Sequence, residues 1–132
     1  MQESTEVRSK KSTRSKSAYL KTNQNARRAD FLRRKLRDVL IRNEPMPPWF
    51  RTMIGCSRDE LRTHLERHFE TEMSWSNYGR GRGRWSIDHT RPMKSFRLGE
   101  FTEDCRAMHY SNLRPMWYCA NSSKGDSLPA EL

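Results

Sequence analysis

The sequence predicts a small α+β protein with a basic helical N-terminal extension, and three observations support this fold class. The chain has 132 residues, of which only 33% are hydrophobic and 32% are charged, so we expect one modest domain plus an extension. Two segments repeat apolar residues at helical spacing. A third, shorter segment alternates apolar and polar residues, as a half-buried strand does.

The net charge of +10 is concentrated in the first third of the chain. Residues 1–43 hold 13 Lys and Arg against 4 Asp and Glu, a net of +9, whereas the remaining residues hold 13 against 12. Such a basic segment attracts polyanions, of which nucleic acid is the commonest. Residues 1–24 carry too few large apolar side chains to offset the entropy of ordering, so we expect a disordered basic arm. This arm is either a solubilising tail or a segment that follows DNA phosphates through Lys10, Lys11, Arg14 and Lys16.

Simple counts argue against several other classes of protein. No apolar run approaches the roughly 18 residues of a membrane span, and the N-terminus lacks the apolar stretch of a signal peptide. We therefore expect a cytoplasmic protein without a membrane partner, in the host-cell cytoplasm if a phage encodes it. Cys56, Cys105 and Cys119 are odd in number, widely spaced and without a CxxC pair, which indicates reduced thiols and no structural zinc.

Residues 25–50 are predicted to form an amphipathic helix followed by a proline-rich linker. The helix is expected over 26–42, where one face is apolar. That face consists of Ala29, Leu32, Leu36, Val39 and Leu40. Basic residues lie largely off it and, next to a basic arm, favour a DNA-facing surface made by Arg27, Arg28, Arg34 and Lys35. The stretch "EPMPPW" ends the helix, because proline lacks a backbone donor and fixes φ.

A second helix begins at "SRDE", residues 57–60. Ser57 is predicted to be the N-cap, with Glu60 completing a capping box. Leu61, Leu65 and Phe69 then place one apolar face toward the core. His64 and His68 are four residues apart, but no neighbouring ligand pattern completes a zinc site, so we expect them at a boundary or on the surface.

Short elements follow in the second half of the chain. The glycines of "GRGRGR", residues 79–84, predict a loop, which is either a plain turn or a source of phosphate contacts from Arg80, Arg82 and Arg84. "WSID", residues 85–88, predicts a strand. We expect a helix over 102–109, an extended segment that begins near position 112, a last helical turn that ends near Gly125, and a frayed tail over 127–132.

Two motifs carry a family resemblance. "IDHTRPM" places Asp88 directly before His89, and "SNLRPMWYCANSSKG" places Asn112 and Asn121 nine residues apart. Together they resemble the D-H, N and N variant of the HNH nucleases, also called the His-Me finger or ββα-metal family. The lead-in "IGCSRDELRTHLERHFETEMSWSNYG" resembles that of homing-type members encoded by phages and large viruses. The resemblance covers roughly residues 27–126 and implies a ββα-metal core, with the HNH nuclease domain over 51–126.

The resemblance implies a role for each motif residue. Asp88 and Asn121 would be the metal ligands, and their hard oxygens favour Mg²⁺ or Mn²⁺. His89 would be the general base that deprotonates the attacking water, a task that suits imidazole near pH 7. Asn112 would fix the loop that aims His89, and Lys124 would contact a phosphate near the scissile bond.

The predicted function is therefore that of a metal-dependent endonuclease acting on double-stranded DNA. In this family, water attack leaves a 5′-phosphate and a 3′-hydroxyl. One alternative is a non-catalytic nucleic-acid-binding protein on the same fold, and another is an accessory nuclease in phage DNA packaging. Neither a target site nor a choice between monomer and homodimer, or between nicking and double-strand cleavage, follows from the sequence.

Overall fold

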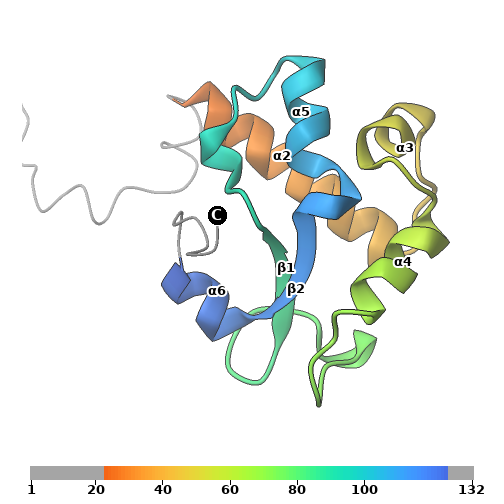
Figure 1. Cartoon of the computed structure of the whole chain (residues 1–132), viewed down its shortest axis with the longest axis vertical. Coiled ribbons are helices and arrows are strands. Elements are labelled where there is room, and N and C mark those ends of the chain that lie inside the picture. The colour runs from red at the N-terminus through yellow and green to blue at the C-terminus, as the bar shows by residue number, and fades with distance from the viewer. Residues whose placement is uncertain (1–22, 125–132) are drawn as a thin grey trace, which may run out of the picture.

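An antiparallel pair of strands lies at the centre of the fold in the computed structural model, which describes residues 23–124 (Figure 1). Strands β1 (Trp85–His89) and β2 (Leu113–Trp117) pair over their full lengths. Helix α6 (Tyr118–Lys124) follows β2 directly and contacts both strands. The strand, strand, helix order confirms the predicted α+β class, and no helix in residues 23–124 is long and apolar enough to cross a membrane.

An insertion separates the two strands along the chain. It contains the 3₁₀ turn η3 (Met93–Ser95), helix α5 (Phe101–Met108) and the 3₁₀ turn η4 (Tyr110–Asn112). Helix α5 confirms the helix expected over 102–109. Its buried residues Ala107 and Met108 join the main core, so the insertion is part of the same packed body as the strands.

Helix α2 (Gln24–Leu40) confirms the predicted amphipathic helix. Asn23 caps it, because its side-chain oxygen accepts a hydrogen bond from the backbone N–H of Ala26 at 2.8 Å. The predicted apolar face is buried throughout: Ala29, Leu32, Leu36, Val39 and Leu40.

Helix α3 (Pro48–Ile54) lies where the sequence was interpreted as a linker. Its first residue is a proline, which is tolerated there because an N–H in the first turn has no helical acceptor to lose. Gly55 ends the helix with φ of 87°, in the left-handed region. A Cβ atom at this position would lie 2.7 Å from Nε2 of His109, so glycine is required both by the turn and by the close approach of α5's end.

Helix α4 (Arg58–Glu66) begins with the predicted capping box of Ser57 and Glu60. The two hydrogen bonds from Ser57 lower the pKa of the Glu60 carboxyl. His64 joins this helix to the sheet, because its Nε2 donates to the backbone oxygen of Leu113 at 2.9 Å. The 3₁₀ turn η2 (Trp75–Asn77) then leads into the glycine-rich loop before β1.

One hydrophobic core joins these elements. It includes residues from α2, α3, α4, α5 and β2, such as Leu36, Phe50, Leu61, Met108 and Leu113. Helix α2 therefore packs against the part of the chain assigned to the nuclease domain, and α3 runs across its expected start at residue 51. The division of the chain into an arm, a helical extension and a nuclease domain stays a prediction.

A buried ion pair fastens α2 to α5. Oδ2 of Asp104 accepts from both Nε and Nη2 of Arg28, at 2.9 Å each, and Oδ1 accepts from the backbone N–H of Gly99 at 2.9 Å. The Asp104 side chain is fully buried. Because burying a carboxylate without partners is costly, these three donors offset the cost of placing Asp104 inside the fold.

Candidate active site

Strand β1 ends with two of the predicted site residues, Asp88 and His89. Asp88 is opposite Arg114 in the register of the two strands, and its Oδ2 accepts from Nε of Arg114 at 2.9 Å. Adjacent strand residues point to opposite faces, so His89 leaves the sheet on the other side. The side chains of Asp88 and His89 therefore leave the end of β1 on opposite faces of the sheet and have different neighbours.

Helix α6 brings Asn121 to the Asp88 side of the sheet. Nδ2 of Asn121 donates to Oγ of Ser86 at 3.1 Å. Ser86 precedes Asp88 by two residues, so both lie on the same face of β1. That face thus gathers a carboxylate, an amide and the guanidinium of Arg114 beneath the last described helix.

The donor chemistry of this face fits a hard divalent cation. Asp88 supplies carboxylate oxygen, and Asn121 makes its hydrogen bond to Ser86 through nitrogen, which leaves its oxygen as the ligand atom a cation would take. Mg²⁺ is commonly held by few protein ligands, with water and substrate phosphate completing its shell. No cluster of three or more His, Cys, Asp or Glu side chains suited to a metal occurs within residues 23–124. The two oxygen donors, Asp88 and Asn121, are the ones that would hold such a cation.

His89 is largely buried at the floor of a cleft. Its Nε2 lies 3.4 Å from Sδ of Met108, which belongs to α5. The residue is only 7% exposed, yet it lines a cleft of about 1100 Å³ together with Asn121 of α6. The cleft therefore contains two of the four motif residues, one from each face of the site.

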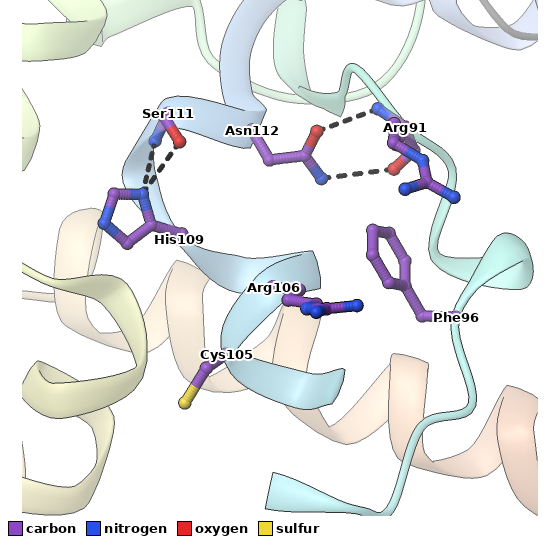
Figure 2. Close-up of a pocket in the computed structure, with 7 residues that line it drawn as sticks. All are labelled: Arg91, Phe96, Cys105, Arg106, His109, Ser111 and Asn112. Carbon is purple, nitrogen blue, oxygen red and sulfur yellow. Dashed lines mark hydrogen bonds between the residues drawn. The ribbon is translucent and has the colours of Figure 1, made fainter. Parts of the chain in front are cut away.

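Asn112 holds the backbone just beyond His89. Its Oδ1 accepts from the N–H of Arg91 at 2.8 Å, and its Nδ2 donates to the backbone oxygens of Arg91 at 3.2 Å and Ala107 at 2.9 Å. The backbone oxygen of Asn112 also accepts from Thr90 at 2.9 Å. Figure 2 shows the paired bonds between Asn112 and Arg91. These contacts are the ones that a loop-fixing asparagine would need.

Helix α2 supplies much of the remaining lining of the cleft that His89 and Asn121 share, which we call the basic cleft. The cleft's lining includes five cationic residues and one acidic residue, Asp30. The cationic residues are Arg33, Arg34, Arg37, Arg80 and Lys94. Tyr78 lies among them, and burial raises the pKa of its phenol although the charges of Arg37 and Arg80 oppose this. The phenol therefore stays neutral and keeps a proton to donate.

Sequence reasoning missed Arg33, Arg37 and Lys94. Arg33 follows Ala29 by four residues, and Arg37 follows Arg33 by four, so they form a stripe beside the buried face of α2. That spacing was readable, but the basic residues assigned to a DNA-facing surface on this helix did not include Arg33 or Arg37. Only the position of the sheet shows which flank of the helix opens onto the cleft.

The remaining predicted DNA contacts fall in several places. Arg28 is engaged by Asp104, and Arg34 lines the cleft while pairing with Asp30 at 3.1 Å. Lys35 is half-buried, and it is not among the residues that line the cleft. Exposed positions are taken by Arg27, Arg80, Arg82 and Arg84. The arm residues Lys10, Lys11, Arg14 and Lys16 lie outside the described residues, as does the side chain of Lys124 at the end of α6.

Comparisons with known proteins add one relative. Over 80 residues the chain is 36% identical to an uncharacterized protein of Acanthamoeba polyphaga mimivirus. The match covers 60% of this chain and 34% of the viral protein, so the chain spans about a third of that relative's length. No family model matches the chain, and no solved structure matches it.

Proposed function

We propose that this chain is a metal-dependent endonuclease of the HNH type that hydrolyses phosphodiester bonds in DNA. The observation that carries the proposal is the basic cleft, because it places an imidazole, His89, and a hard-oxygen donor, Asn121, beneath a wall of arginines. A polyanionic strand is the substrate that such a wall attracts. The ββα order of the central elements supports the same reading.

In this mechanism His89 is the general base. Neutral imidazole takes a proton from water as the water oxygen attacks phosphorus, and the bond from phosphorus to the 3′ oxygen breaks, leaving a 3′-hydroxyl and a 5′-phosphate. A divalent cation bound by Asp88 and Asn121 would supply positive charge to the phosphate oxygens. Asn112 restrains residues 90 and 91 and so fixes the direction from which His89 approaches.

The basic cleft supplies substrate binding separately from the chemistry. Arg33 and Arg37 lie one helical turn apart on α2, which suits contact with successive phosphates of one strand. Tyr78, neutral at physiological pH, would donate to a phosphate oxygen. DNA affinity should therefore fall steeply as salt concentration rises.

A plasmid-nicking assay with Mg²⁺, and with EDTA in its place, tests the proposal. We expect relaxed or linear plasmid only with Mg²⁺, and a loss of about 10²–10⁴-fold in His89→Ala, the usual contribution of a general base. His68→Ala is a matched control, because His68 is exposed on the surface after α4, where it bonds to the backbone oxygen of His64 and packs beside the His64 ring. Cleavage by His89→Ala within tenfold of the unmodified protein would refute the role of His89.

A non-catalytic DNA-binding protein is the second candidate, and one contact favours it. Arg114 already occupies Oδ2 of Asp88, so one ligand oxygen is engaged by a competing cation. If that pairing is permanent, the cleft binds DNA without cutting it. Salt-sensitive binding with no Mg²⁺-dependent cleavage would select this candidate.

A further inference from the structure

A second hollow lies beside the loop that Asn112 fixes, and the side chains of its two arginines have no role in the proposed chemistry. It measures about 510 Å³ and, of the residues that line the basic cleft, shares only Phe96. We call it the arginine hollow, and its lining consists of Arg91, Phe96, Cys105, Arg106, His109, Ser111 and Asn112. Figure 2 shows the side chains of Arg91 and Arg106 directed toward the Phe96 ring.

The arginine hollow is positively charged over an aromatic floor. The guanidinium carbon of Arg91 lies 4.8 Å from the centre of the Phe96 ring, a cation–π contact that holds this flexible side chain in place. Arg106 enters from α5, and Glu103, which contacts it at 3.4 Å, is not part of the lining. The lining thus has two permanent positive charges and no carboxylate.

The Nδ1 atom of His109 is engaged by Ser111 within the hollow's rim. The backbone N–H of Ser111 donates to Nδ1 of His109 at 3.2 Å, so Nδ1 is an acceptor and the Ser111 hydroxyl, 2.8 Å away, donates to it as well. Nδ1 is thus used within its own turn and is not directed at a ligand. Anion binding here would rest on the two guanidinium groups.

Arg91 also lies two residues beyond His89, and Asn112 fixes its backbone through two hydrogen bonds. Two residues span at most about 7 Å of backbone, so the Arg91 side chain leaves the chain close to the point where His89 does. We propose that the arginine hollow binds a second phosphate of the same DNA, held between Arg91 and Arg106. This inference rests on the proposed function, and it assigns the hollow the task of fixing the register of the strand.

The test is a salt series of DNA binding measured by fluorescence anisotropy in EDTA, which removes cleavage from the readout. The variants are Arg91→Gln, Arg106→Gln and the double variant, with Arg67→Gln at an exposed position after α4 as the control. If the two arginines share one phosphate, each variant weakens binding, and the double variant lowers the slope of log K against log salt by about 0.9. Thermal melting confirms that each variant is folded.

Two outcomes overturn the inference. A slope unchanged in the double variant would show that no phosphate is bound there, and a decrease of about 1.8 would show two separate phosphates. Arg33→Gln in the basic cleft distinguishes this failure from failure of the proposed function. If Arg33→Gln lowers the slope while the variants of the arginine hollow do not, the basic cleft binds DNA and the arginine hollow does not. If DNA affinity does not depend on salt and none of the variants changes it, both proposals are refuted.

Discussion

Two arginine–aspartate pairs in this molecule have nearly the same geometry and different surroundings. In each pair an arginine Nε lies 2.9 Å from Oδ2 of the aspartate. The aspartate side chains are 0% exposed in Asp104 and 5% in Asp88, and their arginine partners are 34% and 31% exposed. Distance and burial therefore cannot tell the two pairs apart.

The neighbours of each carboxylate do separate them. Asp104 is enclosed between α2 and α5, and its second oxygen is taken by the backbone of Gly99. Asp88 lies on the sheet face that α6 covers, two residues from the serine that binds Asn121. The first carboxylate holds two helices together, whereas the second lies on the same face of β1 as the serine to which Asn121 is bonded. The structural pair and the candidate site pair thus differ in what surrounds the carboxylate and not in the ion pair itself.

The largest effect should come from removing Asp88. We expect Asp88→Ala to lower Mg²⁺-dependent plasmid cleavage by about 10³-fold or more, since a bound cation contributes several kcal/mol of charge stabilisation to phosphoryl transfer. DNA binding in EDTA should stay within a few-fold of the unmodified protein. Cleavage by Asp88→Ala within tenfold of the unmodified protein would show that Asp88 is not part of the active site. The Asp88–Arg114 pair would then be structural, like the Asp104–Arg28 pair.

Removal of Asp104 should instead affect stability. Asp104→Ala leaves Arg28 and the Gly99 N–H without their acceptor, so we expect a loss of about 3–5 kcal/mol in the free energy of unfolding. Urea denaturation measures this loss, and Asp88→Ala should lose less because β1 and β2 are also held together by their backbone pairing, whereas Asp104 joins α5 to α2. Equal losses in the two variants would show that Asp88 is a structural anchor as well.

Arg114 offers a smaller and more selective effect. Its guanidinium competes with a cation for Asp88, and like charges a few ångströms apart near a protein surface repel by a few kcal/mol. We therefore expect Arg114→Gln to tighten Mn²⁺ binding by about tenfold in calorimetric titration of the DNA-free protein. Arg28→Gln is the matched control and should leave Mn²⁺ affinity unchanged. Weaker Mn²⁺ binding by Arg114→Gln would show that the arginine orients the carboxylate instead of competing for it.

Local patterns in the sequence predicted most elements of this fold. The apolar spacing of α2, the capping box of α4 and the alternation of β1 each depend on residues close in sequence. Helix α3 was missed because Pro48 is its first residue and Pro47 its N-cap, positions that permit a helix, whereas a proline further in would break it. From the sequence alone, the proline-rich start of α3 looks the same as a linker, because the pattern does not show at which residue the helix begins.

Contacts between distant residues set the limit of prediction for the site. Arg28 and Asp104 are 76 residues apart, and no local pattern indicates that this arginine is taken up by an internal carboxylate. Asn121 and Ser86 are likewise joined only by the packing of α6 on the sheet. The motif residues could be named from their spacing, but the flank of α2 that faces them could not, because it depends on how the helix is rotated against the core.

The smallest effect should come from removing the N-cap of α2. Asn23→Ala removes the hydrogen bond to Ala26 and should lower the free energy of unfolding by about 1 kcal/mol in urea denaturation. The cap and the Arg28–Asp104 pair secure the same end of α2, so Asn23→Ala combined with Asp104→Ala should lose less stability than the sum of the two. Combined with Asp88→Ala, which is tied to the sheet, its effect should be additive within about 0.5 kcal/mol. If the effect of Asn23→Ala were instead non-additive with Asp88→Ala and additive with Asp104→Ala, α2 would be held by the Asp88–Arg114 pair. The distinction between the structural pair and the candidate site pair would then be wrong.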